Sequence, residues 1–171
     1  WYFLFFVGSF LMRSVGCIIN DLIDIRIDEK IIRTSKRPLV IKSVKISEAI
    51  ILLIILMGLS LLILLKFNLN TIFVGILSIP LIIIYPYMKR YISWPQLILG
   101  IIFSWGIIIV SIEFYGYLSY PLILLYLGCI FWTLGYDTIY SYQDREDDIK
   151  NNIKSTAVLF KDKGKKFVLL F

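Results

Sequence analysis

Long, nearly uninterrupted runs of Ile, Leu, Phe and Tyr recur along the chain, and they constrain its fold more than any other feature. Each run is close to the roughly 20 residues that a helix needs to cross a bilayer. Of the 171 residues, 59% are hydrophobic, whereas ordinary globular domains contain about 45–50% apolar residues. We therefore expect an all-α integral membrane protein, a multi-helix transmembrane bundle, rather than a soluble helical domain. The expected segments lie at about 1–20, 47–65, 71–88, 96–113 and 119–141, with a sixth beginning near Phe167.

The chain opens inside an apolar run at Trp1 and closes as another run begins. No cleavage site of the signal-peptide type follows the first run. We therefore expect residues 1–171 to be an internal part of one longer transmembrane domain, with about five complete spans.

The basic residues predict how the spans are oriented. The polar stretches 21–46 and 142–166 each hold seven Lys or Arg residues, the link 89–95 holds two, and the two other links share one. Five spans place the three basic segments on the same side, which the positive-inside rule assigns to the cytoplasm. The net charge of +6 therefore reflects topology and a lipid bilayer as partner, and no nucleic-acid partner is expected.

Side chains suited to soft metals or to histidine chemistry are scarce. The sequence has no His, and its two cysteines, Cys17 and Cys129, both lie within apolar runs. This excludes His-based catalysis within the chain and argues against a zinc or transition-metal site. Arg13 lies within the first span, where a charge is costly, so we expect it to face a cavity or a partner.

A first acidic cluster follows the first apolar run. Asn20, Asp24 and Asp28 are spaced i, i+4 and i+8, which places them on one face of a helix, about one turn apart. Asp21 lies close to the same stripe. Like charges at this spacing destabilise a helix, so a cation is expected to offset them.

A second acidic cluster follows the fifth run. Asp144 and Asp148 are again spaced i, i+4, and Asp137 lies two turns earlier. Such acids can simply decorate a solvated helix end. Two clusters on the same predicted side, each at the end of a span, instead favour a site for Mg²⁺ or Ca²⁺, which both prefer oxygen ligands. Mg²⁺ in particular is often shared between carboxylates and substrate phosphates.

Two facing acidic stripes suggest two Mg²⁺ ions that hold a diphosphate, with basic side chains from the same loops binding the remaining phosphate oxygens. Many of these basic residues also set the topology. An apolar helical bundle below such a rim offers a groove for an isoprenoid tail. The candidate phosphate-binding residues are Arg33, Arg37, Lys89, Arg90, Lys150 and Lys154.

These clusters resemble the signatures of the UbiA superfamily of intramembrane prenyltransferases. The signature Asn-Asp-x-x-Asp-x-x-x-Asp is matched by Asn20, Asp21, Asp24 and Asp28. The second, Tyr-Asp followed by Asp-x-x-x-Asp, is matched by Tyr136, Asp137, Asp144 and Asp148. Further stretches resemble the 4-hydroxybenzoate polyprenyltransferase branch, in the family's order and over essentially the whole chain. They lie at 12–21, 33–39, 85–91, 94–96, 136–140, 144–150 and 154–157.

The resemblance implies a nine-helix bundle with a central cavity, whose first and last helices lie outside this chain. It implies Mg²⁺-dependent transfer of a polyprenyl group from polyprenyl diphosphate to 4-hydroxybenzoate in ubiquinone synthesis. It also implies a bacterial inner membrane, or a mitochondrial one in a eukaryote, with the site facing the cytoplasm. The metal ligands would be Asn20, Asp24, Asp28, Asp144 and Asp148.

The resemblance leaves some roles open. Asp21 or Asp137 would accept the ring proton or orient a ligand. The ring faces of Tyr85, Tyr136 and Tyr140 would shield a carbocation, unless these residues only pack at the membrane interface.

Three alternatives stay open beside this interpretation. One is a superfamily member with another acceptor, such as a naphthoate, homogentisate or haem. Another is a divalent-cation transporter with acidic stripes along a pore, although carboxylates at span ends favour an enzyme rim. The third is a purely structural membrane protein, which would not need both clusters. One local departure from the branch is Lys161, which follows Phe160 where Gly is usual, and we expect it to alter a loop end rather than the chemistry.

Overall fold

The computed structural model describes residues 1–168, and within them every regular element is helical. Five helical segments are long and apolar enough to cross a membrane, with α4 and α5 together forming one of them. The predicted all-α fold with five spans is therefore confirmed, whereas most of the predicted sixth segment lies outside the described residues. The elements are α1 Tyr2–Asp28, α2 Ile46–Leu64, α3 Leu69–Tyr91, α4 Pro95–Phe103, α5 Trp105–Tyr115, α6 Tyr120–Ser141, α7 Arg145–Lys150, α8 Thr156–Phe160, η1 Lys161–Lys163 and α9 Gly164–Val168.

Local sequence signals explain several helix boundaries. The side chain of Asn68 caps α3 by accepting a hydrogen bond from the Thr71 amide at 3.0 Å. Pro95 occupies the first turn of α4, where its missing N–H costs nothing. Gly116 ends α5 in the left-handed conformation, with φ of 73°.

The fourth predicted span, 96–113, is divided in the structure into two helices. The break falls at Ser104, between α4 and α5. Immediately after it, the Trp105 indole donates to the backbone carbonyl of Val74 on α3 at 3.1 Å. A hydrophobic run of this length predicted one span correctly, but it carried no signal for the interruption.

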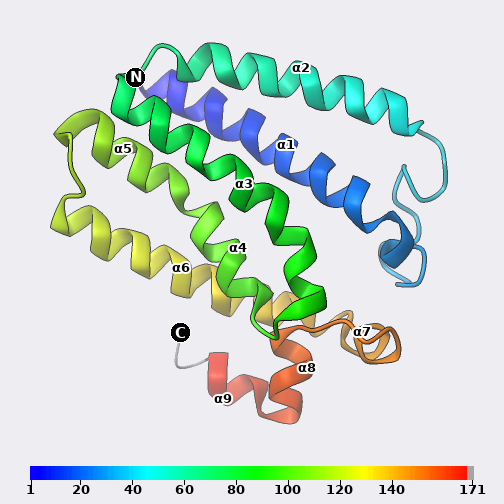
Figure 1. The fold of residues 1–171 in the computed structure, drawn as a ribbon. Helices are drawn as coiled ribbons and strands as arrows, with labels where there is room; N and C mark the ends of the chain where they lie inside the picture. Colours follow the sequence, from blue (N-terminus) through cyan, green and yellow to red (C-terminus); the bar gives the residue numbers. More distant parts are fainter. Residues whose placement is uncertain (169–171) are drawn as a thin grey trace.

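The spanning helices lie side by side in the order α2, α1, α3, α4 with α5, and α6 (Figure 1). Few side chains are fully buried between them, among them Val15, Thr71 and Thr138. On α2 only Ala49 is buried, and most of its Ile and Leu side chains point outward. Outward-facing apolar side chains are what a lipid environment requires, so the fold fits a bilayer rather than water.

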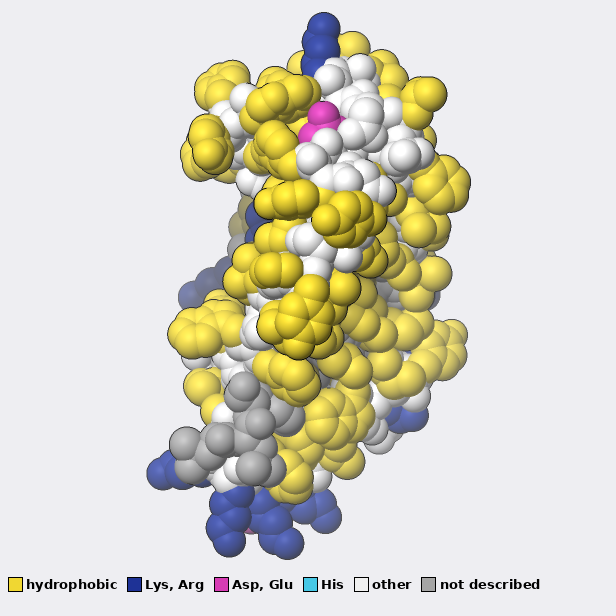
Figure 2. Space-filling view, turned by 90° about the vertical axis from the view of Figure 1, so that its left-hand side faces the viewer, with side chains coloured by type: hydrophobic (Ala, Val, Ile, Leu, Met, Phe, Trp, Pro, Cys, Tyr) yellow, Lys and Arg dark blue, Asp and Glu magenta, His cyan; other side chains and the backbone are white. Residues whose placement is uncertain are grey.

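The two ends of the bundle differ in character. The C-terminal ends of α1, α3 and α6 and the short helix α7 lie at one end, with the loop 29–45 beside them (Figure 1). At the opposite end, hydrophobic side chains cover most of the surface (Figure 2). There the Asn68 amide donates to Glu113 at 3.1 Å and ties the start of α3 to the end of α5. The loop 29–45, the end of α3 and α7 therefore share one end, in agreement with the predicted alternation of basic segments (Figure 1).

The departure at Lys161 has a backbone consequence. Its φ of 51° and ψ of −127° place a side chain where glycine is favoured. Its carbonyl accepts a 2.6 Å hydrogen bond from the hydroxyl of Tyr142. The residue lies at the end of α8, and the expectation that this departure alters a loop end rather than the chemistry stays a prediction.

Candidate functional site

The first acidic cluster occupies the last two turns of α1. The helix continues to Asp28, so the predicted i, i+4, i+8 stripe exists. Asp24 is fully buried and Asp28 is 3% exposed, whereas Asn20 and Asp21 are half-buried. A carboxylate withdrawn from water needs a cationic partner, so the surrounding charges decide what this face can do.

Two basic residues supply those charges. Arg37, in the loop after α1, uses one guanidinium nitrogen to reach both Asp21 and Asp28 at 2.7 Å. Lys89, near the end of α3, donates to Asp24 at 2.5 Å. The other oxygen of Asp24 is buried without a hydrogen bond, and Arg90 approaches it only to 3.7 Å. Asp24 therefore retains one carboxylate oxygen that is available as a ligand.

The second acidic cluster begins just before α7 and runs into it. Asp148 is 6% exposed and accepts a hydrogen bond from the Ser155 hydroxyl at 3.1 Å. Burial raises the pKa of Asp148 to about 6, the Ser155 bond opposes this shift, and the charge of Asp144 adds to it. Asp137 lies earlier, half-buried on α6.

Arg33 joins the two clusters. From the loop that follows the first cluster, its Nε donates to both oxygens of Asp144 at 2.9 and 3.1 Å, and its Nη2 donates to one of them at 2.5 Å. The hydrogen bonds to Asp144 raise the pKa of Arg33 above its ordinary value. Next to it, the Ile32 amide donates to Asp147 at 3.0 Å. The loop therefore holds both acidic clusters at one end of the bundle.

The predicted tyrosines are placed unequally around these acids. Tyr140 lies beneath Arg33, whose guanidinium carbon is 5.0 Å from the ring centroid, and stacks with Tyr136 on the same helix at 6.2 Å. Tyr85 on α3 is half-buried and lies within electrostatic range of Asp24 and Asp137. Aromatic faces thus come from two helices that flank the acidic end.

The last two predicted phosphate-binding residues are set apart from the acids of α1. Lys150 is 69% exposed and approaches Asp147 only to 3.8 Å. Lys154 donates to the Tyr91 carbonyl at 2.8 Å, and its own amide donates to the Lys89 carbonyl at 2.8 Å. In this structure Lys154 therefore fastens the link after α7 to the end of α3.

Some contributors had no clear signal in the sequence. Asp147 lies off the i, i+4 stripe, yet it anchors the loop through the Ile32 amide. Ser155 orients Asp148 and also caps α8. Gln96 is 3% exposed and accepts a hydrogen bond from the Thr156 amide at 3.3 Å. These residues position the acids through contacts between distant segments, which spacing alone does not predict.

The donor set fits a shared Mg²⁺ site better than a closed metal cage. Among the described residues, no three Asp, Glu, Cys or His side chains converge closely enough to hold a metal ion. Mg²⁺ typically binds through one or two protein carboxylates together with phosphate oxygens and water. The oxygen of Asp24 that lacks a hydrogen bond, and the carboxylates around it, match that mode of binding.

Five apolar spans and an end built from paired acids and bases define a class: integral membrane proteins that carry a charged site at one end of a helical bundle. A model of the UbiA prenyltransferase family matches residues 1–171, and the chain belongs to that family. This confirms the resemblance seen in the two acidic signatures.

The chain is similar to curated relatives that bear one function. It is 44% identical to the 4-hydroxybenzoate octaprenyltransferase of Pseudomonas savastanoi pv. phaseolicola, over 98% of this chain and 56% of the relative. It is 41% identical to the enzyme of the same name from Colwellia psychrerythraea, over 96% of this chain and 58% of the relative. The chain thus spans a little more than half the length of these relatives.

Two solved structures share the fold. A UbiA homologue from Aeropyrum pernix, in its apo form, superposes with a TM-score of 0.83 at 26% identity, covering 97% of this chain and 63% of the other. A structure described as digeranylgeranylglyceryl phosphate synthase gives 0.68 at 25% identity, covering 97% and 58%.

Proposed function

We propose that the protein containing this chain transfers a polyprenyl group from polyprenyl diphosphate to the ring of 4-hydroxybenzoate, ortho to the hydroxyl, in ubiquinone biosynthesis. The relatives' shared name supports the choice of acceptor. The observation that carries the chemistry is the clustering of paired carboxylates and basic side chains at one end of an apolar bundle. That arrangement suits a ligand with a multiply charged head and an apolar tail.

In this proposal the acids and bases have separate tasks. Mg²⁺, when bound, neutralises the diphosphate and so promotes its departure. The residues that would hold it are Asn20, Asp24, Asp28, Asp144 and Asp148. Arg33, Arg37 and Lys89 exchange their carboxylate partners for phosphate oxygens, so that each cation stays paired throughout. Arg90 lies beside Asp24 and contributes positive charge to the same rim, whereas Lys150 and Lys154 remain proposed contacts at its edge.

The bond changes follow from these positions. The allylic C–O bond breaks and its electron pair leaves with the diphosphate, which the basic side chains stabilise. The ring carbon ortho to the phenol attacks the resulting carbocation. The faces of Tyr85, Tyr136 and Tyr140 shield that cation. The ring proton then passes to a carboxylate, for which Asp21 and Asp137 are the candidates.

The cell-level features of the proposal rest on topology. The end that carries the acids and basic loops faces the cytoplasm, in accordance with the positive-inside rule. The membrane is the inner membrane of a bacterium, or that of a mitochondrion in a eukaryote. Residues 1–171 act as one part of a single transmembrane domain, with further helices supplied elsewhere in the protein.

The test uses the complete protein in membranes with labelled 4-hydroxybenzoate and a polyprenyl diphosphate. We expect a lipid-soluble aromatic product that disappears with a chelator and returns with Mg²⁺. Full activity after exhaustive chelation would remove the metal from the proposal. Product formation from a naphthoate or homogentisate, with none from 4-hydroxybenzoate, would change the acceptor.

A further inference from the structure

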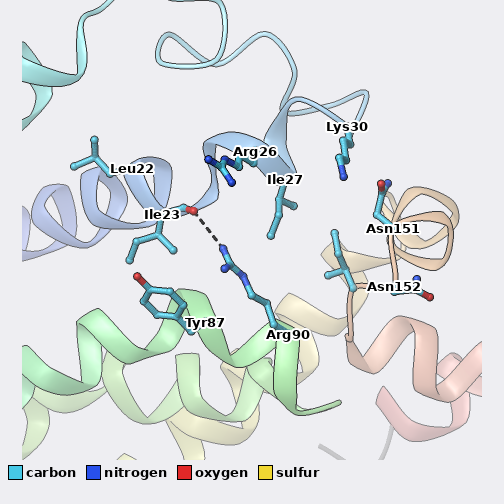
Figure 3. Close-up of a pocket in the computed structure, with 10 residues that line it drawn as sticks. Leu22, Ile23, Arg26, Ile27, Lys30, Tyr87, Arg90, Asn151 and Asn152 are labelled. Atoms are coloured by element: carbon cyan, nitrogen blue, oxygen red, sulfur yellow. Dashed lines mark hydrogen bonds between the residues drawn. The ribbon is translucent and has the colours of Figure 1, made fainter.

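A second polar site lies behind the acidic face of α1. A pocket of about 650 Å³ opens between the ends of α1 and α3 and the link after α7 (Figure 3). From α1 it is lined by positions 22, 23, 26 and 27, and Lys30 lines it from just beyond the end of the helix. Positions 22, 23 and 26 lie on the side of the helix away from the stripe at 20, 24 and 28. Apart from Arg90, which also approaches Asp24 to 3.7 Å, its lining residues are distinct from those of the site of the two acidic clusters.

The lining combines positive charge with an apolar base. Arg26, Lys30 and Arg90 supply three cations, and two Asn side chains add amides. No acidic residue is among the described residues that line it. The remaining lining residues are apolar or aromatic. They are Leu22, Ile23, Ile27, Tyr87 and Ile153.

The cations of this pocket differ from those beside the acidic clusters. Arg33, Arg37 and Lys89 are each paired with a carboxylate at 2.7 Å or less. Arg26 and Lys30, by contrast, form no ion pair with any residue that the structure describes. In Figure 3, Lys30 extends from the end of α1 toward Asn151, while Arg90 rises from α3. Arg26 and Lys30, which have no carboxylate partner among the described residues and lie beside two Asn side chains of the pocket, are suited to bind an external anion.

Arg90 is held where it can serve this pocket. Its Nη2 donates to the Ile23 carbonyl at 3.3 Å (Figure 3), and its guanidinium lies 5.2 Å from the ring centroid of Tyr87. Its contact with Asp24 is a long one, at 3.7 Å. Its remaining donors are therefore free to turn toward a ligand.

We propose that this pocket binds the headgroup of an anionic phospholipid. The pocket lies at the basic end of the bundle, where the spanning helices α1 and α3 end and lipid headgroups gather. Basic pockets between transmembrane helices on this side of a membrane are suited to anionic headgroups. The apolar base provides for the first part of the acyl chains, which free phosphate does not possess. The proposal does not depend on the prenyl-transfer reaction.

The test measures lipid affinity on the complete, purified protein. Phosphatidylglycerol and phosphatidylcholine are titrated separately in detergent, and the bound lipid is counted by native mass spectrometry. We expect phosphatidylglycerol to bind more tightly. The double variant Arg26→Gln/Lys30→Gln should weaken phosphatidylglycerol roughly tenfold or more, because each basic side chain contributes about 1 kcal/mol toward an anionic lipid. Phosphatidylcholine binding should not change.

Two further variants separate site binding from general charge and from misfolding. Lys36→Gln/Lys42→Gln removes the same charge from the loop at the same end, outside the pocket, and should leave phosphatidylglycerol affinity unchanged. The swap Arg26→Lys/Lys30→Arg keeps both charges and should retain the preference. The melting temperature of each variant is measured beside its lipid affinity, so that misfolding is distinguished from loss of binding.

Three outcomes would overturn the proposal. Equal losses in the pocket and loop variants would mean a diffuse charge effect. Displacement of phosphatidylglycerol by millimolar inorganic phosphate would mean a small-anion site. Equal affinity for the two lipids would mean that the pocket does not select a headgroup, as when another part of the protein covers it.

Discussion

Arg33 and Asp144 are 111 residues apart in the sequence, yet the guanidinium of Arg33 donates three hydrogen bonds of 2.5–3.1 Å to the carboxylate of Asp144. This contact fixes the loop after α1 against the start of α7. It therefore connects the first acidic cluster on α1, through the loop that follows it, to the second acidic cluster at α7.

This link between Arg33 and Asp144 should be measurable as a coupling. A double-mutant cycle with Arg33→Gln and Asp144→Asn should give a coupling free energy of up to about 1 kcal/mol, since Arg33 is 37% exposed and water screens the pair. The measurement is the free energy of unfolding by denaturant in bicelles. The matched control is Arg145 with Asp162, whose carboxylate is 92% exposed, and its coupling should be close to zero. Equal values for the two pairs would contradict the role given to Arg33.

Carboxylates proposed as ligands should differ from bystanders. Asp24→Asn and Asp148→Asn keep the side-chain size but remove the charge, so the rate of prenyl transfer should fall roughly 10²-fold or more. Glu146→Gln is exposed and lies outside the i, i+4 stripe, so it should lose much less. Asp162→Asn should be close to neutral. Rates are read beside expression and melting temperature, and equal losses in all four folded variants would refute the two-stripe site.

Lys161→Gly should stabilise the protein. The φ of 51° is strained for a lysine and easy for glycine, so the change should raise the free energy of unfolding by about 1 kcal/mol. The control is Lys163→Gly in the adjacent 3₁₀ turn, which should lower it by about 0.5–1 kcal/mol. A melting curve in detergent distinguishes the two, and destabilisation by both would exclude backbone strain at position 161.

Gly100→Ala should loosen the packing of α4 on α6. A Cβ at this position would lie 3.0 Å from the backbone carbonyl oxygen of Ile130, which cannot turn aside as a side chain can. The expected cost is about 1–3 kcal/mol. Gly128→Ala meets nothing within 4 Å and should be neutral or slightly stabilising, because alanine favours helix. If Gly100→Ala melted like Gly128→Ala, the close approach would be wrong.

The topology predicts which loops share a side. In a background without Cys17 and Cys129, single cysteines at Ser43 and Asn152 should react with a membrane-impermeant reagent from the cytoplasmic side only. A cysteine at Tyr117, in the link after α5 at the opposite end of the bundle, should react from the opposite side only. Labelling of Ser43 and Asn152 from different sides would overturn the arrangement.

The parts of the fold that the sequence predicted are those that depend on local patterns. Apolar runs located the spans, and the i, i+4, i+8 spacing placed Asp24 and Asp28 on one helical face. The hydropathy of the fourth run did not predict the break between α4 and α5 at Ser104. The sequence also did not predict which basic residue pairs with each acid. The pairing of Arg33 with Asp144, or of Lys89 with Asp24, depends on how separate helices pack. Lys154 shows the same limit, since its contact with the Tyr91 carbonyl depends on where the chain returns after α7.

The ion pairs also predict an order in which the helices assemble. A chain is synthesised from its N-terminus, so its N-terminal segments are available to fold first. Asp21, Asp24 and Asp28 of α1 are paired with Arg37 and Lys89, and Lys89 follows Asp24 by 65 residues. The partners of these acids therefore lie in the loop after α1 and at the end of α3, and both are synthesised before α6. Asp144 is synthesised after Arg33, so we expect the second acidic cluster to dock onto a surface that the earlier helices provide.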